Sequence, residues 1–245
     1  ALILERVSLE VEKGAFVTIV GASGCGKSTF LRMLLSQEVP SRGEILIDGE
    51  KLPPEPTPDR GIVFQRYSVF PHLTVEENLM LSAEFDAAPL TGRLFGSKRA
   101  AARDAVTETL ERIGLAQARK RYPTQLSGGM QQRLALAQAL IKKPRILLLD
   151  EPFGALDPGI RADMHKLVLS LWKEQRLTVF MITHDIDEAI LLADRILLMS
   201  NGPFARVAES VEITIPRPRN RTDIVEHPNY YAIRNHLVHF LGQRS

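Results

Sequence analysis

The segment Gly21–Thr29 combines the residue types that bind phosphate groups through backbone amides. It follows an apolar segment that ends at Val20 and matches the pattern G-x-x-x-x-G-K-[ST]. Its glycines let the backbone fold into a nest of inward-pointing N–H groups, and a helix that starts near Lys27 adds the positive end of its dipole. We expect Lys27 to reach the β- and γ-phosphates of a nucleotide and the Ser28 hydroxyl to ligate Mg²⁺. The expected cofactor-binding residues of this loop are Gly21, Ala22, Ser23, Gly24, Cys25, Gly26, Lys27, Ser28 and Thr29.

A pair of acidic residues follows a second apolar segment. The run Ile146–Leu149 is continuously apolar, which is typical of a parallel strand covered on both faces, and it leads into Asp150 and Glu151. Beside a phosphate loop, Asp150 can hold Mg²⁺ through water and Glu151 can polarise an attacking water. Alone, the first motif could be a glycine turn without a ligand and the second a strand that enters a solvated turn. Together they predict a site that hydrolyses a nucleotide.

Four further motifs stand in a fixed order along the chain. The segment Leu126–Gln132, which reads Leu-Ser-Gly-Gly-Met-Gln-Gln, resembles the signature motif of ABC transporter ATPases. Gln65 is similar to the glutamine of the family's Q-loop, Asp157 to the aspartate of its D-loop, and His184 to its switch histidine. The resemblance covers about residues 2–199, and the shared order makes it far more specific than any one motif.

The resemblance implies that two nucleotide-binding chains meet head to tail. ATP would be clamped between the phosphate loop of one chain and the signature motif of the other. Ser127, Gly128 and Gly129 would therefore contact the γ-phosphate bound by the partner chain. Gln65 and His184 would sense that phosphate, and its hydrolysis would loosen the dimer.

The resemblance also implies ATP and Mg²⁺ as cofactors and assigns roles within each chain. The catalytic residues would be Lys27, Gln65, Glu151 and His184. The metal ligands would be Ser28, Gln65 and Asp150. Outside the phosphate loop, the cofactor-binding residues would be Gln65, Ser127, Gly128, Gly129, Asp157 and His184.

The family usually places an adenine-stacking aromatic residue, with an additional strand, before the segment equivalent to residues 2–11. Neither precedes that segment in the printed sequence, which begins at Ala1 without a methionine. Truncation of the N-terminal segment is one explanation, and a different mode of holding adenine is the other. The sequence therefore predicts no adenine-stacking residue.

An α/β framework is needed to position these motifs. We expect a P-loop NTPase core with a parallel sheet, an antiparallel β subdomain and an inserted α-helical subdomain. The sheet would contain the strands that end at Val20, Leu149 and Thr183, and Asp48-Gly49 predicts a hairpin. The chain would form a single ABC ATPase domain over residues 1–245. Its expected parts are a core at about 1–72 and 144–215, a helical insertion at about 73–143 and a C-terminal helical tail at about 222–245.

Capping patterns mark several helices of this framework. Thr74 with Glu77 and Asp185 with Glu188 predict capping boxes at helix N-termini. Gly114 stands where a C-terminal cap would end a helix that carries Val106, Leu110 and Ile113 on one face. Near the end of the chain, residues 228–240 place Tyr230, Ile233, Leu237 and Phe240 at helical spacing, which predicts a packing helix.

Composition excludes several classes of protein. The chain has 245 residues, of which 44% are hydrophobic and 24% charged, so it is neither disordered nor collagen-like. No apolar run approaches the ~18 to 20 residues that cross a bilayer. A net charge of +2 gives no argument for nucleic-acid binding. The single cysteine, Cys25, excludes an internal disulfide framework and fits a reducing compartment.

The C-terminal stretch at residues 200–221 resembles importers of the nitrate, sulfonate and taurine group. That resemblance implies three partners, which are a second ATPase chain, a transmembrane permease and a periplasmic substrate-binding protein. The chain would lie on the cytoplasmic face of the inner membrane, attached through the permease, with the loop Tyr67–Leu73 as its contact. The alternative is that Phe70 and Leu73 of this loop pack inside their own subdomain. The Arg217, Arg219 and Arg221 run favours a solvated, proline-stiffened edge over an anion site.

Two other functions are compatible with these motifs. The first is the ATPase subunit of an exporter, which uses the same motifs. The second is a non-transport ABC ATPase of chromosome maintenance or translation. Only 100 positions separate Lys27 from Ser127, with no heptad array between them, and the chain has one cassette. Both features disfavour the non-transport classes.

Overall fold

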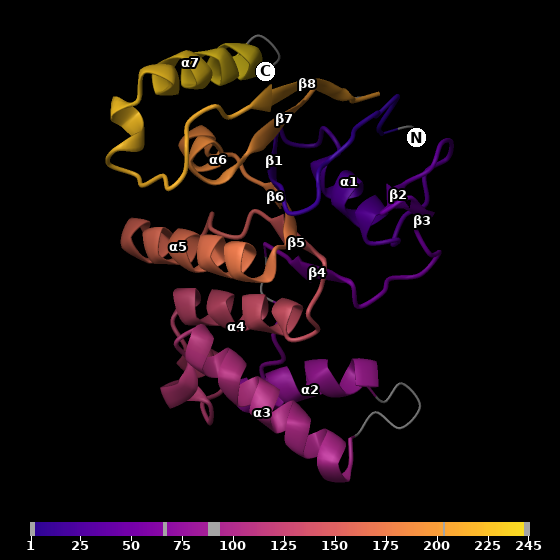
Figure 1. Cartoon of the computed structure of the whole chain (residues 1–245), viewed down its shortest axis with the longest axis vertical. Helices are drawn as coiled ribbons and strands as arrows, with labels where there is room; N and C mark the ends of the chain where they lie inside the picture. Colours follow the sequence, from indigo (N-terminus) through magenta and orange to yellow (C-terminus); the bar gives the residue numbers. More distant parts are fainter. Residues whose placement is uncertain (1–2, 66–67, 88–93, 203, 243–245) are drawn as a thin grey trace. The chain divides into compact units, whose positions relative to one another are not determined.

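The structure of the protein is a computed structural model. The chain divides into two compact units (Figure 1). The residues described are 3–65, 68–87, 94–202 and 204–242. The first unit comprises Ala1–Thr57, Leu148–Glu151 and Trp172–Ser245, and the second unit comprises Pro58–Leu147 and Pro152–Leu171. The core, insertion and tail boundaries expected from the sequence stay a prediction.

The first unit is built on a mostly parallel sheet. Strand β1 (Phe16–Val20) lies between β6 (Thr178–Ile182) and β7 (Arg195–Met199) and is parallel to both. Strand β5 (Ile146–Asp150) follows β6 in the strand order, and β8 (Val207–Glu212) pairs antiparallel with β7. Every residue of β1 and β6 is buried, because helices cover strands of this kind on both faces. The expected parallel sheet is confirmed, with β8 as an antiparallel edge.

Helices pack on this sheet from both sides. Helix α1 (Lys27–Leu34) contacts β6 through the rings of Phe30 and Phe180, whose centroids are 6.1 Å apart. Helix α6 (Ile186–Leu192) lies on the other side of the strands in Figure 1. Helix α7 (Pro228–Gly242) confirms the predicted C-terminal packing helix. Its buried residues are Tyr230 and Leu237.

The first unit also contains the small antiparallel sheet expected from the sequence. Strand β2 (Leu46–Ile47) pairs with β3 (Glu50–Lys51). The two turn residues, Asp48 and Gly49, have φ values of 52° and 83°. Positive φ at both positions is the conformation of a tight type I′ hairpin, which Asp-Gly favours.

The proline-rich segment that follows β8 corrects one prediction. The guanidinium of Arg217 donates to Asp194 Oδ1 at 2.7 Å and lies 4.5 Å from the centre of the Trp172 ring. Arg219 donates to the carbonyl oxygen of Ala193 at 2.5 Å. The expectation of a solvated edge is therefore wrong for Arg217 and Arg219. Their guanidinium N–H groups donate to carbonyl oxygens that are left unpaired at the end of α6. Arg221 is exposed, as expected.

The second unit is mainly helical. It contains β4 (Arg60–Val63), α2 (Val75–Ala87), α3 (Gly96–Arg112), α4 (Gly128–Leu140) and most of α5 (Pro158–Gln175). Two 3-10 turns, at Ala116–Ala118 and Pro123–Gln125, connect α3 to α4. The apolar side chains of α2, α3 and α4 form one buried cluster. Its members include Val75, Leu79, Val106, Leu110, Ile113 and Leu134.

The predicted caps of this unit are present. The Glu77 carboxylate accepts from the Thr74 backbone N–H at 2.8 Å, and the Thr74 hydroxyl accepts from the Glu77 N–H at 3.3 Å. This reciprocal pair is a capping box at the start of α2. Gly114 has a φ of 69° after the last turn of α3, as its assignment to a C-terminal cap requires.

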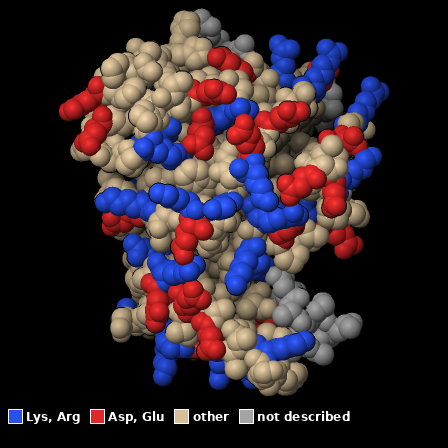
Figure 2. All heavy atoms as spheres, in the orientation of Figure 1, with Lys and Arg blue, Asp and Glu red and all other residues tan. Residues whose placement is uncertain are grey.

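Two surface features bear on the partners of the chain. Within the described ranges, no helix is both long and apolar enough to cross a membrane. On the face seen in Figure 2, Lys and Arg side chains are interspersed with Asp and Glu side chains, in keeping with the net charge of +2.

We predict that Leu110→Ala strongly destabilises the helical cluster. Leu110 is 2% exposed, and truncating a leucine in such a core costs about 2–5 kcal/mol in the free energy of unfolding. Denaturant unfolding followed by far-UV circular dichroism measures the effect. The matched control is Leu46→Ala, the same substitution at a leucine that is 50% exposed, which should change stability by about 0.5 kcal/mol or less. Equal effects at the two sites would contradict the assignment of Leu110 to the core.

Candidate functional site

The glycine-rich loop joins β1 to α1 in the first unit. Gly24 and Gly26 have φ values of 78° and 95°, a region that residues with a side chain rarely adopt. A Cβ on Gly21 would lie 2.9 Å from both the Cys25 sulfur and the Met199 side chain. Glycine is therefore required at these three positions for the loop to turn tightly from a buried strand into a helix.

Lys27 occupies the centre of this loop. Its side chain is nearly buried, with 6% of the residue exposed. The ammonium group donates to the carbonyl oxygens of Gly21 and Ala22, each at 2.8 Å, and lies 3.9 Å from the Cys25 sulfur. A buried ammonium group is a charged donor that can bind a phosphate oxygen, and this one also interacts electrostatically with Asp150.

Ser28 and Asp150 supply oxygen ligands beside the loop. The Ser28 hydroxyl hydrogen-bonds to the Asp150 carboxylate, which lies at the end of β5. Burial raises the pKa of Asp150, and the hydrogen bond from Ser28 opposes that shift. A hydroxyl and a carboxylate are the hard oxygen donors that Mg²⁺ prefers, so these two residues fit the ion. In the portion of the chain that is described, no group of three or more His, Cys, Asp or Glu residues could hold a metal ion.

Glu151 and His184 form a close pair next to these ligands. His184 Nε2 lies 2.5 Å from Glu151 Oε1, and the two side chains are 47% and 24% exposed. Glu151 has a φ of 48°, which is unusual for a residue other than glycine. Its backbone N–H donates to the Ile182 carbonyl at 3.1 Å, which ties it to the end of β6. The neighbouring Thr183 N–H donates to the Ile19 carbonyl of β1 at 3.3 Å.

Hydrogen bonds at the start of α6 fix Thr183 and Asp185, the two residues on either side of His184. Asp185 caps the helix by accepting from the Glu188 N–H at 3.0 Å, which confirms this half of the predicted capping box. The Glu188 carboxylate is buried and accepts from the Thr183 hydroxyl at 2.5 Å. That hydroxyl in turn accepts from the Asp185 N–H at 3.1 Å. Neither the role of Thr183 nor the inward direction of Glu188 is predicted from the sequence, although a threonine next to a predicted site residue is a signal.

The first unit therefore brings together the phosphate loop, Asp150, Glu151 and His184. The other predicted site residues belong to the second unit, where Gln65 follows β4 and Asp157 precedes α5. The side chains of both are exposed. Tyr67, at the start of the loop expected to contact a permease, lies outside the described residues. Phe70 of that loop is 43% exposed, and Asn78 holds the loop by accepting from the Phe70 N–H at 2.8 Å.

The signature motif forms the N-terminus of α4. Ser127 is the N-cap, and its hydroxyl accepts from the Met130 N–H at 3.4 Å. Gly128 is the first helical residue. Gly129 packs against Ile160 of α5 so closely that a Cβ on Gly129 would overlap the Ile160 Cγ2 atom. The motif thus presents backbone N–H groups at a helix N-terminus, the arrangement that binds anions.

The chain is similar to known ABC transporter proteins in sequence and in structure. The sequence profile of the family described as "ABC transporter" matches residues 4–154. The solved structure titled "Dimeric Structure of MJ0796, a Bacterial ABC Transporter Cassette" is similar over 87% of this chain and 92% of that one, with a TM-score of 0.72 and 34% identity. A post-hydrolysis dimer of the same cassette, bound to ADP and Pi, has a TM-score of 0.71 and 33% identity.

Curated relatives are similar along the whole chain. The bicarbonate transport ATP-binding protein CmpC of Synechococcus elongatus is 42% identical over 244 residues, which are 100% of this chain and 36% of CmpC. The nitrate import ATP-binding protein NrtC of the same organism is 42% identical over 98% of this chain and 35% of NrtC. The bicarbonate transport ATP-binding protein CmpD is 43% identical over 99% of this chain and 84% of CmpD. The chain thus spans about a third of the length of CmpC and NrtC and most of the length of CmpD.

The packing of Gly129 on Ile160 predicts a suppressor pair. Gly129→Ala would gain about 1 kcal/mol from helix propensity. The overlap with Ile160 should outweigh this gain, because overpacking a close contact costs about 1–3 kcal/mol. We therefore expect Gly129→Ala to lower the melting temperature. Adding Ile160→Ala removes the overlapping Cγ2 atom and should restore much of the loss.

Thermal unfolding of both single variants and the double variant measures this coupling, with Ile160→Ala alone as the control. If the double variant melted at the sum of the two single losses, the contact between these residues would not be the reason for glycine at position 129.

Proposed function

The chain belongs to the ABC transporter family, and we propose that it is the ATP-hydrolysing subunit of an importer of small anions. The observation that carries the proposal is the Glu151–His184 contact of 2.5 Å beside the loop that buries Lys27. A passive nucleotide-binding module needs the loop alone. A base paired with a histidine next to that loop supports hydrolysis of the bound nucleotide.

We assign the steps of binding and hydrolysis to residues of the first unit. The N–H groups of the loop and the ammonium of Lys27 bind the phosphates of ATP. Glu151 orients and polarises the attacking water, and His184 contacts the γ-phosphate while it holds the Glu151 carboxylate in place. Ser28 and Asp150 would hold Mg²⁺, which neutralises charge on the phosphates when it is bound. We propose Gln65 as a further ligand of the metal and a sensor of the γ-phosphate.

We propose that the complete site needs two chains. Ser127, Gly128 and Gly129 would bind the γ-phosphate held by the loop of a partner chain, and Asp157 would contribute to the same nucleotide site. The helix N-terminus at Gly128 and the dimeric state of the related MJ0796 cassette support this arrangement. Closure on ATP and release after hydrolysis would then convert chemistry into motion.

A separate permease would receive that motion at the cytoplasmic face of the membrane. The exposed ring of Phe70 supports a contact through its loop, since an exposed aromatic side chain is a common interface residue. A periplasmic binding protein would deliver the substrate to the permease. The names of CmpC, CmpD and NrtC, which are bicarbonate and nitrate transport proteins, support an importer of small inorganic anions over an exporter. Sulfonates and taurine belong to the same proposed group.

Glu151→Gln should separate nucleotide binding from hydrolysis. The substitution keeps the size of the side chain and removes its charge and basicity, so we expect turnover to fall by ~10²-fold or more. Binding should persist, because Lys27, Ser28 and the loop are intact. Losing the carboxylate also removes repulsion against the γ-phosphate, so ATP-bound dimers should accumulate. Steady-state hydrolysis and size-exclusion chromatography with ATP or ADP in the presence of Mg²⁺ measure both effects.

Asp150→Asn is the contrasting variant for this test. It weakens the metal site itself, so it should impair MgATP binding together with turnover. A Glu151→Gln chain that hydrolysed ATP at the parental rate and stayed monomeric would remove Glu151 from the proposed mechanism.

Mixing two inactive variants tests whether the site is shared between chains. Ser127→Arg should block the signature motif, and Lys27→Ala should block the phosphate loop. In a mixed dimer, the loop of the first variant faces the signature of the second, and that site is intact. With random pairing, the mixture should recover roughly a quarter of the parental ATPase rate, while each variant alone stays inactive. No recovery from a mixture shown to contain mixed dimers would refute a shared site.

A further inference from the structure

The short helix α6 is anchored at both ends by the C-terminal part of the chain. At its start, Asp187 accepts two hydrogen bonds at 2.8 Å, one from the Tyr230 hydroxyl and one from Arg234 Nε of α7. Tyr230 is 4% exposed, and burial together with this hydrogen bond raises its pKa to about 12. The hydroxyl is therefore a stable donor to Asp187 at every pH at which the protein would work.

At the other end, the two arginines of the proline-rich segment cap α6. Arg217 donates to the Leu192 carbonyl at 2.6 Å. Arg219 donates to the Ile190 carbonyl at 3.0 Å as well as to Ala193. Burial lowers the pKa of Arg219 to about 10, and the neighbouring charge of Arg217 adds to that shift. Both guanidinium groups donate to carbonyl oxygens at the C-terminal end of the helix.

The anchored end of α6 leads directly to the site. Asp187 is next to Glu188, whose buried carboxylate holds the Thr183 hydroxyl on the other side of His184. A displacement of the first helical turn would therefore move His184 relative to Glu151. The 2.5 Å contact between these two side chains leaves little room for such a displacement.

We infer that Tyr230 and Arg234 are positioning residues for ATP hydrolysis, which act by fixing Asp187 and through it the direction of His184. This inference rests on the proposed function of His184. Neither residue is part of the nucleotide site. Their contribution lies in holding a seven-residue helix that is too short to be stable without tertiary contacts.

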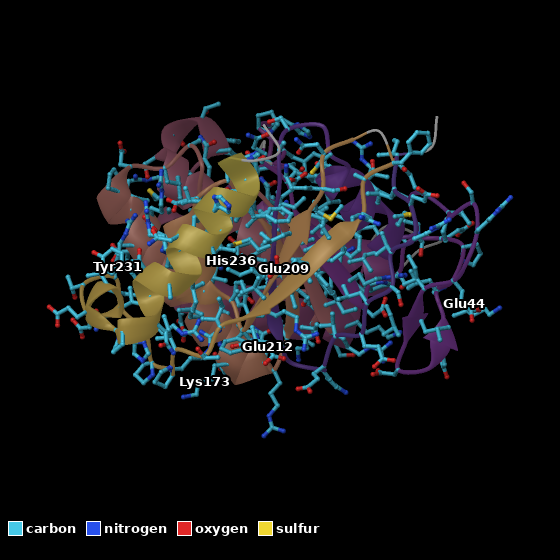
Figure 3. All side chains as sticks on the ribbon, turned by 90° about the horizontal axis from the view of Figure 1, so that it is seen from above. Glu44, Lys173, Glu209, Glu212, Tyr231 and His236 are labelled. Atoms are coloured by element: carbon cyan, nitrogen blue, oxygen red, sulfur yellow. The ribbon has the colours of Figure 1, made fainter. Side chains whose placement is uncertain are left out.

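A second contact of α7 supplies a matched control. Figure 3 shows α7 lying over β8, with His236 beside Glu209, and His236 Nε2 lies 2.7 Å from Glu209 Oε1. This pair also ties α7 to the rest of the first unit, but it does so through Glu209 of β8 and not through Asp187 of α6. If kcat falls only because α7 packs less tightly, it should therefore fall in His236→Gln as well.

The test compares Tyr230→Phe, Arg234→Met and the double variant with His236→Gln in the full chain. Tyr230→Phe keeps the buried ring and removes only the hydroxyl, and Arg234→Met removes a partly exposed charge without a large change in volume. A misplaced catalytic group costs much of its rate, so we expect kcat of the double variant to fall by about tenfold. KM for ATP should stay within about twofold, because the phosphate loop is untouched. His236→Gln should keep the parental kcat.

The deciding measurement repeats the double substitution in a His184→Ala background. If Tyr230 and Arg234 act through His184, the double substitution should have no further effect on kcat there. Arg234→Lys, which keeps the charge near Asp187, should recover part of the loss seen in Arg234→Met. An equal fall in kcat with and without His184, or an unchanged kcat in the parental background, would overturn the inference alone. A parental rate in His184→Ala itself would instead overturn the proposed role of His184, and the inference with it.

Discussion

The register of three neighbouring strands is the constraint on which the rest of the site depends. The chain continues its backbone pairing one residue beyond the strand ends, so that Glu151 bonds to Ile182 and Thr183 bonds to Ile19. These bonds place the first residues after β5 and β6 at the same edge of the sheet as the phosphate loop after β1. Because successive side chains of a strand point to opposite faces, a slip of one residue would turn Glu151 or His184 away from the loop.

This register explains why the backbone of Glu151 is strained. Glu151 adopts a positive φ, and a non-glycine residue in that region carries about 1–3 kcal/mol of strain. The strain is offset by the bond to Ile182 and by the continuous burial of the strands on either side. Because the backbone turns at Glu151, the carboxylate of this residue lies next to His184. The same surroundings keep Asp150, one position earlier, aimed at Ser28.

Motifs whose chemistry is local could be predicted from the sequence. The loop at residues 21–29, the strand before it and the helix after it are encoded in one continuous segment, and the structure has all three. The Asp-Gly hairpin and the Thr74 capping box are local in the same sense. The hydrogen bonds of Arg217 and Arg219 to the end of α6 could not be predicted in this way. Charged residues between prolines indicate a solvated segment, and only the fold brings the end of α6 to them.

Gly129 shows a further limit of reasoning from motifs. From the sequence, the family resemblance implies only that Gly128 and Gly129 contact a phosphate bound by a partner chain. The structure gives Gly129 a packing reason, because Ile160 occupies the space where a Cβ would stand. Ile160 lies in the first turn of α5, and the backbone carbonyl of Asp157, immediately before that helix, accepts from the Arg161 N–H at 2.8 Å. The signature motif and the segment around Asp157 are thus parts of one packed body, and residues proposed to serve a partner's nucleotide would move together as that body moves.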